Sequence, residues 1–215
     1  MKKPLILIVL ILLIDQILKV WIKTTFSYGE EVNLIGDWCR LHFIENKGMA
    51  FGMAFGGDAG KIILTTLRIV ASVIIFIYMR RLVAKGAKKI VIYSFAFIFC
   101  GAIGNVIDSI FYGVLFSEST IFSTAVFLPE SGGYAPLFLG KVVDMFYFPL
   151  IDTVLPEWIP IWGGNHFSFF NAIFNVADAS ITTGVTLLII YFLFCKKETE
   201  QEETPTVKTE NTDQI

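Results

Sequence analysis

Four stretches of this sequence are apolar enough, and long enough, to cross a lipid bilayer as helices. They cover residues 4–22, 62–79, 90–115 and 174–195. Crossing about 30 Å of hydrocarbon takes roughly 20 helical residues, because an α-helix rises about 1.5 Å per residue. Of the 215 residues in the chain, 55% are hydrophobic and 21 are Phe. These features predict an all-α integral membrane protein built as a bundle of four transmembrane helices.

The basic residues predict how the bundle is oriented. Four crossings place both termini on the same side of the membrane. Lysine and arginine gather at three places that this topology brings to that side: Lys2 and Lys3, the connector 80–89, and Lys196 and Lys197. Because positive charge is retained on the cytoplasmic side, both termini are predicted to be cytoplasmic.

Two longer segments then fall on the outer side of the membrane. Residues 23–61 contain alternating apolar patches and a glycine pair, which predict a small β-rich cradle with turns. Residues 116–170 are rich in Phe, Pro, Gly and Trp, which favours a loop or helical insert lying partly in the membrane interface. Residues 196–215 are polar and predict a disordered cytoplasmic tail. The remaining residues, 1–195, are expected to form a single membrane domain.

Several functional classes find little support in the composition. A net charge of -2 provides no basic field for nucleic acid. The cysteines and histidines are too scattered for a disulfide framework or a zinc motif. They are Cys39, Cys100, Cys195, His42 and His166. A nucleic-acid-binding protein and a metalloenzyme are therefore both disfavoured.

Ionisable residues within or beside the apolar spans are the candidate functional residues, because a charge in hydrocarbon is costly unless it is paired or used. Counting about 1.5 Å per residue from the basic helix ends places Asp108 and Asp178 at one level near the outer boundary. The same count places Asp15 and Arg68 roughly 18 Å from the inner surface, as candidate partners across two helices.

Residues three or four positions apart share a helix face, so several amides and charges are expected to project together. An amide beside a carboxylate can hold it by hydrogen bonds, orient a water molecule or polarise a carbonyl. Three such pairs occur: Asn175 with Asp178, Asn105 with Asp108, and Asp15 with Lys19.

These residues favour different interpretations. The pair Asp15 and Lys19 is interpreted first as a structural ion pair that ties helices together. Asp178, which is flanked by small residues, is interpreted first as catalytic. Asp108 is open between a catalytic role and fixing a loop, and Asp144 alone could be an ordinary interfacial residue. Glycines 101 and 104 favour close helix packing, since no phosphate-loop pattern surrounds them.

Five short motifs in order along the first 195 residues resemble those of one family. They are Asp15-Gln16-x-x-Lys19, Asn46-x-Gly48-x-Ala50-Phe51, Gly101-Ala102-x-Gly104-Asn105-x-x-Asp108, Val142-Val143-Asp144 and Phe174-Asn175-x-Ala177-Asp178. On these residues the chain resembles lipoprotein signal peptidase, also called signal peptidase II, a family of bacterial membrane aspartic peptidases. The ordered set, on a chain with four spans, is highly specific.

The resemblance implies that Asp144 and Asp178 form the catalytic dyad of an aspartic endopeptidase. The implied substrate is a diacylglyceryl-modified prolipoprotein, cut just before the lipidated cysteine so that the signal peptide is released. Eight further residues are then expected to position the substrate or support the dyad: Asp15, Lys19, Asn46, Gly48, Phe51, Asn105, Asp108 and Asn175.

The resemblance also implies a setting for the enzyme. No metal or organic cofactor is implied. The expected partners are the prolipoprotein substrates and membrane lipids, with no nucleic acid and no particular oligomeric state. The expected location is the bacterial cytoplasmic (inner) membrane, with the active site near its outer face.

Two features depart from the family pattern. The family usually has arginine after the Asp of its third motif, whereas Ser109 follows Asp108 here. Arg68, inside the second span, is the predicted substitute, either balancing Asp108 or pairing with Asp15. The outer segment 116–170 is longer than the family norm, and a lid or substrate cradle is one interpretation of it.

The chemistry expected of the dyad follows from elementary electrostatics. Two carboxylates close together cannot both ionise easily, so one holds a proton while the other activates water. Two other functions stay open as alternatives at this point. A small-molecule transporter would normally show inverted repeats and helix breaks near the midplane. A membrane scaffold protein would not need Asp144 or Asp178.

Overall fold

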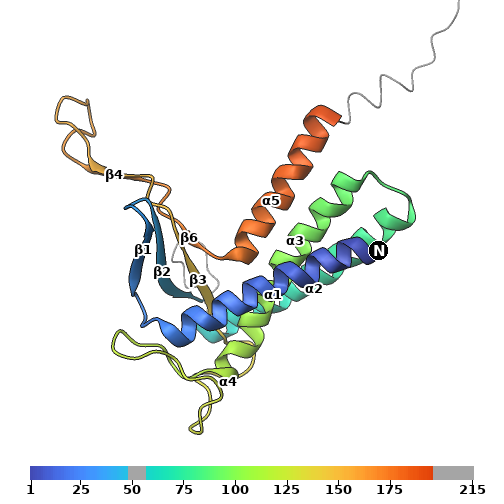
Figure 1. Ribbon diagram of the computed structural model, residues 1–215, viewed down its shortest axis with the longest axis horizontal. Helices are drawn as coiled ribbons and strands as arrows, with labels where there is room; N and C mark the ends of the chain where they lie inside the picture. Colours follow the sequence, from blue (N-terminus) through green and yellow to red (C-terminus); the bar gives the residue numbers. More distant parts are fainter. Residues whose placement is uncertain (48–56, 196–215) are drawn as a thin grey trace, which may run out of the picture.

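The computed structural model describes residues 1–47 and 57–195, and its main body is a bundle of four long helices (Figure 1). All four are long and apolar enough to cross a membrane, which confirms the predicted spans to within a few residues. They are α1 (Lys2–Thr25), α2 (Gly57–Ala84), α3 (Lys89–Ile107) and α5 (Val176–Ile190). Shorter segments continue two of them: η1 (Asp108–Tyr112) and α4 (Gly113–Leu115) follow α3, and η2 (Tyr191–Cys195) follows α5.

Helix α3 packs against each of the other three long helices, so it forms the centre of the bundle. Its contact with α5 is unusually close because glycines face the other backbone. A Cβ added at Gly101 would lie 2.2 Å from the carbonyl oxygen of Ala177, and one added at Gly184 would lie 2.5 Å from that of Ser94. The expected packing role of Gly101 is confirmed, and it fixes how deeply the start of α5 sits in the bundle.

A small antiparallel sheet lies at one end of the bundle, where α1 ends and α5 begins (Figure 1). Its strand order is β1-β2-β3-β6. The strands are β1 (Glu31–Ile35), β2 (Cys39–Asn46), β3 (Val142–Tyr147) and β6 (Ile173–Phe174). The predicted sheet within 23–61 is thus present as β1 and β2, and it is completed by two strands from the segment between the third and fourth spans.

The sheet is joined to the bundle by one hydrophobic cluster. Phe43 and Met145, on adjacent strands, are fully buried and pack in the same cluster as Ile22 of α1 and Tyr112 of η1. Burying one such side chain contributes roughly 1.5–3 kcal/mol to stability relative to leaving it exposed. The sheet and the helix ends therefore form one rigid support for the residues that they carry.

The segment 116–170 is folded differently from one of the predicted alternatives. Its backbone is described throughout, and it contains strands and turns, so the expectation of a helix there is wrong. Strands β4 (Ile151–Val154) and β5 (His166–Phe169) form a separate two-stranded arm that projects from the body (Figure 1). Proline and glycine interrupt this region, which disfavours a continuous helix. The predicted tail, 196–215, lies outside the described residues.

Candidate active site

The two acids expected to form the dyad come from different elements at the same end of the bundle. Asp144 lies within β3 and is only 2% exposed, whereas Asp178 lies in the first turn of α5 and is half-buried. Helix α5 begins here because Asn175 caps it: the Asn175 side-chain oxygen accepts a hydrogen bond from the Asp178 backbone N–H, at 3.0 Å. An Asn cap of this kind satisfies a backbone donor at the helix start.

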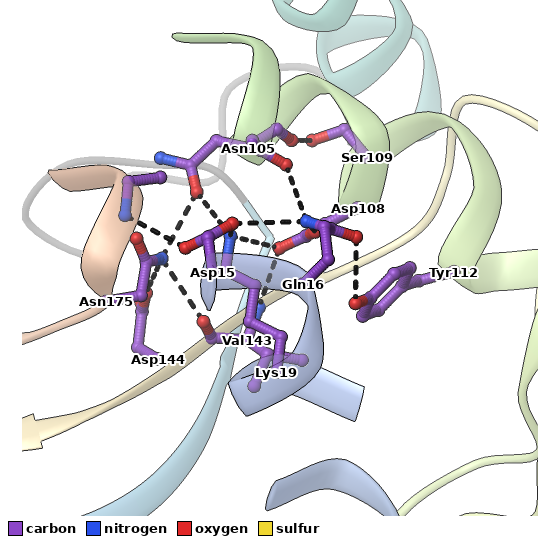
Figure 2. Close-up of polar contacts among 12 residues, drawn as sticks. Asp15, Gln16, Lys19, Asn105, Asp108, Ser109, Tyr112, Val143, Asp144 and Asn175 are labelled. Carbon is purple, nitrogen blue, oxygen red and sulfur yellow. Dashed lines mark hydrogen bonds and ion pairs between the residues drawn. The ribbon is translucent and has the colours of Figure 1, made fainter. Parts of the chain in front are cut away.

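Two asparagines link the two acids to each other, and Figure 2 shows the part of this link that joins Asn105, Asn175 and Asp144. The Nδ2 of Asn175 donates to Asp144 Oδ1 at 2.7 Å and to Asn105 Oδ1 at 3.1 Å. The Nδ2 of Asn105 in turn donates to Asp178 Oδ1 at 2.7 Å. The amides therefore form a continuous hydrogen-bonded bridge from one carboxylate to the other, and the fold brings together four residues that the sequence singled out.

The environment of Asp144 favours its protonated form. Burial, and next the negative charge of Asp178, raise the pKa of Asp144 from its ordinary value of 3.8 to about 7. The charge of Lys19 and hydrogen bonds from Asn175 and Asn46 act in the opposite direction. A carboxyl group with this pKa can hold a proton near neutral pH and still release it during a reaction.

Below the dyad, three buried charges form a compact ion triad. The Lys19 ammonium lies 3.0 Å from Asp15 Oδ2 and 2.8 Å from Asp108 Oδ2, and each of the three side chains is at most 1% exposed. The expected pair of Asp15 and Lys19 is present, and Lys19 is also the cation that balances Asp108. Asp15 lies on α1, and Asp108 lies where α3 ends. The long side chain of Lys19 reaches both carboxylates.

The expectation for Arg68 is wrong in its choice of partner. The ion pairs of Asp15 and Asp108 are with Lys19, while the carboxylates that act on Arg68 are those of Asp178 and Asp144. The helical count put Arg68 at the level of Asp15 but could not say which way its side chain turns. Its positive charge acts on the dyad itself.

Each carboxylate of the ion triad also holds the backbone beside a dyad residue. Asp15 Oδ1 accepts a hydrogen bond of 2.9 Å from the N–H of Ala177, which immediately precedes Asp178. Asp108 Oδ2 accepts one of 3.4 Å from the N–H of Val143, which immediately precedes Asp144. The triad is therefore hydrogen bonded to the backbone of both elements that carry the two acids.

Sequence reasoning missed Gln16 as a member of this site. Its Nε2 donates to Asp15 Oδ2 at 3.1 Å and to Asp108 Oδ1 at 3.0 Å, and its Oε1 accepts from the hydroxyl of Tyr112 at 3.2 Å. Gln16 is the second residue of the motif Asp15-Gln16-x-x-Lys19. Because it follows Asp15 directly, it lies on a different helix face, so pairing residues three or four positions apart did not select it. The motif itself was the signal that could have found it.

A second polar cluster beside the triad was also missed. Lys23 pairs with Glu45, which in turn binds Lys141 at 2.9 Å, and Ser119 donates to Glu45 Oε1 at 3.1 Å. Burial acts to raise the pKa of Glu45, but the two ammonium groups hold it below its usual value. Lys23 lies one helical turn beyond Lys19, and that spacing was the only sequence signal for this cluster.

The remaining expected site residues have mixed outcomes. Asn46 ends β2, opposite Val142 of β3, and hydrogen bonds to Asp144. Gly48 and Phe51 lie outside the described residues. Within 1–47 and 57–195, no three His, Cys, Asp or Glu side chains gather as they would around a metal ion.

Comparisons with known proteins give a consistent result. A family model described as signal peptidase (SPase) II matches residues 7–194. A protein of Porphyromonas gingivalis (strain ATCC 33277) named lipoprotein signal peptidase is 46% identical over 187 residues, which cover 86% of this chain and 80% of that protein. A protein of the same name from Amoebophilus asiaticus (strain 5a2) is 34% identical over 184 residues, covering 84% and 73%.

Solved structures support the fold. Two that are described as bacterial membrane enzymes are each 24% identical to this chain, with TM-scores of 0.59 and 0.54. The alignment with the first structure covers 97% of this chain and 96% of the solved chain. The alignment with the second covers 90% of this chain and 94% of the solved chain. At this identity the similarity establishes a shared fold.

Proposed function

This chain belongs to the signal peptidase II family, and from that premise we propose that Asp144 and Asp178 are its catalytic dyad. As a member of the family it is a multi-pass membrane aspartic peptidase that removes signal peptides from prolipoproteins. The observation that supports the dyad is the bridge of Asn105 and Asn175, which ties the two carboxylates into one hydrogen-bonded unit.

The proposed reaction divides the work between the two acids. Two coupled carboxyl groups titrate as a pair and hold one proton between them near neutral pH. The raised pKa of Asp144 favours that residue as the acid. Asp178, as the base, takes a proton from water as the water attacks the scissile carbonyl. Asp144, as the acid, donates to the developing oxyanion, and the pair then returns a proton to the departing amine. This division of roles needs no cofactor.

In this proposal, neighbouring residues hold the two carboxyl groups in fixed positions during the proton transfer. Asn105 and Asn175 fix the carboxylate orientations, and Asp15, Lys19 and Asp108 fix the backbone on which the acids stand. Asn46 hydrogen bonds to Asp144 from the neighbouring strand. Gly48 and Phe51, which follow it in the same motif, belong to this proposal as substrate-positioning residues.

The proposed substrate carries a diacylglyceryl group on the cysteine that follows the cut. Each buried CH₂ of such a group contributes about 0.8 kcal/mol to membrane binding, so the lipid holds the substrate at the bilayer. The apolar signal segment then lies among the helices, and the cut site meets the dyad where the bundle joins the sheet. Lipidation is therefore expected to decide which precursors are cleaved.

The orientation in the membrane forms part of the same proposal. Both termini are placed in the cytoplasm, because Lys2, Lys3 and the basic connector 80–89 lie at the end of the bundle opposite the sheet. The four-stranded sheet then forms a cradle outside the inner membrane of a bacterium, and the segment 116–170 lies at the interface. Residues 1–195 act as a single domain.

The test is cleavage of two precursor peptides that differ only in the diacylglyceryl group. Purified protein is expected to cleave the lipidated peptide alone. Asp144→Asn and Asp178→Asn should each lower its turnover at least about a hundredfold, because each removes a proton carrier from the reaction. Asp37→Asn, at an exposed acid between β1 and β2, is the matched control and should leave turnover unchanged.

Size-exclusion profiles must show that the two variants insert and fold as the unchanged protein does. Appreciable cleavage by either folded variant would refute the dyad. Equal cleavage of the two peptides would refute the role of the lipid.

A further inference from the structure

A pocket separate from the dyad opens at the sheet end of the bundle. It has a volume of about 340 Å³ and lies between the start of α2 and the segment that leads into β3. Its lining combines three lysines with two acids and a few apolar side chains. The residues used below are Lys47, Asp58, Lys61, Glu118, Pro136, Leu139 and Lys141.

Lys61 is the unusual member of this pocket. Its side chain is only 6% exposed, yet among the side chains that the structure describes no carboxylate lies within ion-pair distance of its ammonium group. The charges that act on it most strongly are repulsive: Lys141, Lys47 and Arg68 oppose it, and Asp58 attracts it more weakly. A buried cation without a close counter-charge is costly.

The other acids near the pocket are already engaged. Lys141 binds Glu45 at 2.9 Å and Glu118 at 3.3 Å, and Lys23 binds Glu45 as well. Lysines therefore outnumber the acids available to them on this face. The start of α2 adds to the positive field, because unpaired backbone N–H groups and the helix dipole favour an anion at a helix N-terminus.

The position of Lys61 along α2 matches the depth of lipid headgroups. Helix α2 has 28 residues and is about 42 Å long, which exceeds the roughly 30 Å of hydrocarbon that it crosses. Lys61 and Arg80 are separated by about 29 Å along the axis, close to that thickness. When Arg80 lies at one headgroup layer, Lys61 lies at the other.

We propose that this pocket binds the phosphate of one anionic phospholipid. Lys61 is its main ligand, Lys47 contacts it from the exposed mouth, and Pro136 and Leu139 contact the glycerol and upper acyl carbons. A pocket of this size suits a single small headgroup, since ligand sites commonly enclose about 300–1,000 Å³.

The experiment measures lipid binding by the purified full chain in neutral detergent. Native mass spectrometry follows titrations with short-chain phosphatidylglycerol, short-chain phosphatidylcholine and inorganic phosphate. The unchanged protein is expected to retain one phosphatidylglycerol more tightly than either other probe. Lys61→Gln should weaken that binding at least about tenfold, which is the scale of a hydrogen bond to a charged group.

Two further variants complete the design. Lys85→Gln removes the same charge from an exposed position in the opposite connector and should bind phosphatidylglycerol normally. Lys47→Gln, at an exposed position, should fold and show a smaller loss, so it tests the proposal even if Lys61→Gln does not fold. Unchanged binding in Lys47→Gln and in any folded Lys61→Gln, or equal affinity for phosphatidylcholine, would overturn the pocket assignment. Equal affinity for inorganic phosphate would overturn the lipid as its occupant.

Discussion

Lys19 is the central cation of the polar network that contacts the segments carrying the two proposed catalytic acids. It neutralises Asp15 and Asp108, and these two carboxylates accept the backbone N–H groups that precede Asp178 and Asp144. It also donates to Asn105 Oδ1 at 3.0 Å. One ammonium group therefore supports the bridge between the acids and the two chain segments that carry them.

Replacing Lys19 by Met should destabilise the protein strongly, because it leaves two buried carboxylates without their cation. Removing one partner of a buried ion pair typically costs roughly 3–5 kcal/mol, and turnover should fall with it. Adding Asp108→Asn to Lys19→Met should restore part of the loss. Unfolding titrations in detergent give the free energies, with Lys3→Met, at an exposed lysine, as the control. A loss equal to that of Lys3→Met would contradict the role of the triad.

The pH dependence of turnover should report the proton on Asp144. In the proposed mechanism activity requires that proton, so turnover should decline as the pH rises through about 7, the pKa that burial and the charge of Asp178 give to Asp144. Asn46 stabilises the ionised form by a hydrogen bond. Asn46→Ala should therefore raise this pKa and move the alkaline limb of the pH–rate profile to higher pH.

Asn33→Ala, at an exposed position on β1, is the control for that shift. The carboxyl group of Asp144 also makes the free energy of unfolding depend on pH. Between its unfolded pKa of 3.8 and its folded pKa of about 7 the folded protein holds a proton that the unfolded chain has lost. The stability that Asp144 contributes is fully present below pH 3.8 and is lost as the pH rises through about 7. Asp144→Asn should remove that dependence, and an alkaline limb that stays in place or moves down in Asn46→Ala would contradict the assignment.

At the scale of elements, the contact between α3 and α5 sets the distance between the asparagines and the dyad. Asn105 stands on α3, and Asn175 and Asp178 stand at the start of α5. Their hydrogen bonds form only if the two helix backbones approach closely. Gly101 and Gly104 permit that approach, since a Cβ at Gly104 would lie 2.9 Å from the Cβ of Ala177.

Gly101→Ala should push α5 away from α3, because the added methyl would meet the Ala177 carbonyl oxygen at 2.2 Å. Overpacking of this kind commonly costs about 1–3 kcal/mol. Turnover should fall as well, since the displaced helix carries Asp178. Ala71→Val, at an exposed position on α2, is the control for added volume. Stability and turnover like those of the control would show that the helices tolerate separation here.

At the scale of the whole molecule, the arm of β4 and β5 projects beyond the bundle (Figure 1). Near its tip Trp158 is 80% exposed, Ile161 is 91% exposed and Trp162 is 65% exposed. Apolar side chains this exposed normally mark a surface that meets a membrane or a partner. Tryptophan in particular is favoured at the boundary between lipid and water.

The tryptophans of the arm should lie in the membrane interface. A variant with Trp21→Phe and Trp38→Phe leaves Trp158 and Trp162 as the sole tryptophans of the four in the chain. Their fluorescence should be quenched by phospholipids brominated high on the acyl chains. A second variant, which keeps Trp21 as its sole tryptophan at a position on α1 that is 45% exposed, gives the reference for a residue inside a predicted span. Absence of quenching in the first variant would place the arm in water.

The sequence by itself determined the four apolar spans and the family to which the chain belongs, and it singled out Asp144 and Asp178 as the proposed catalytic pair. Each span depends on about 20 consecutive residues, so hydropathy read along the chain is sufficient to find it. The five motifs likewise lie within a few residues each, and they carried the family resemblance. Asp144 and Asp178 could be named in this way before anything was known of their separation.

The tertiary structure alone decided how these local pieces meet. Strand β3 pairs with β2, and Lys19 lies between Asp15 and Asp108. The charges of Asp178 and Asp144 act on Arg68. All of these interactions join residues that are distant in sequence or offset along the helices. Helix spacing gives a residue's height and face, but it does not give the direction of a long side chain or the neighbour across the bundle. Those contacts follow from how closely the helices and the sheet pack, and packing is a property of the whole fold.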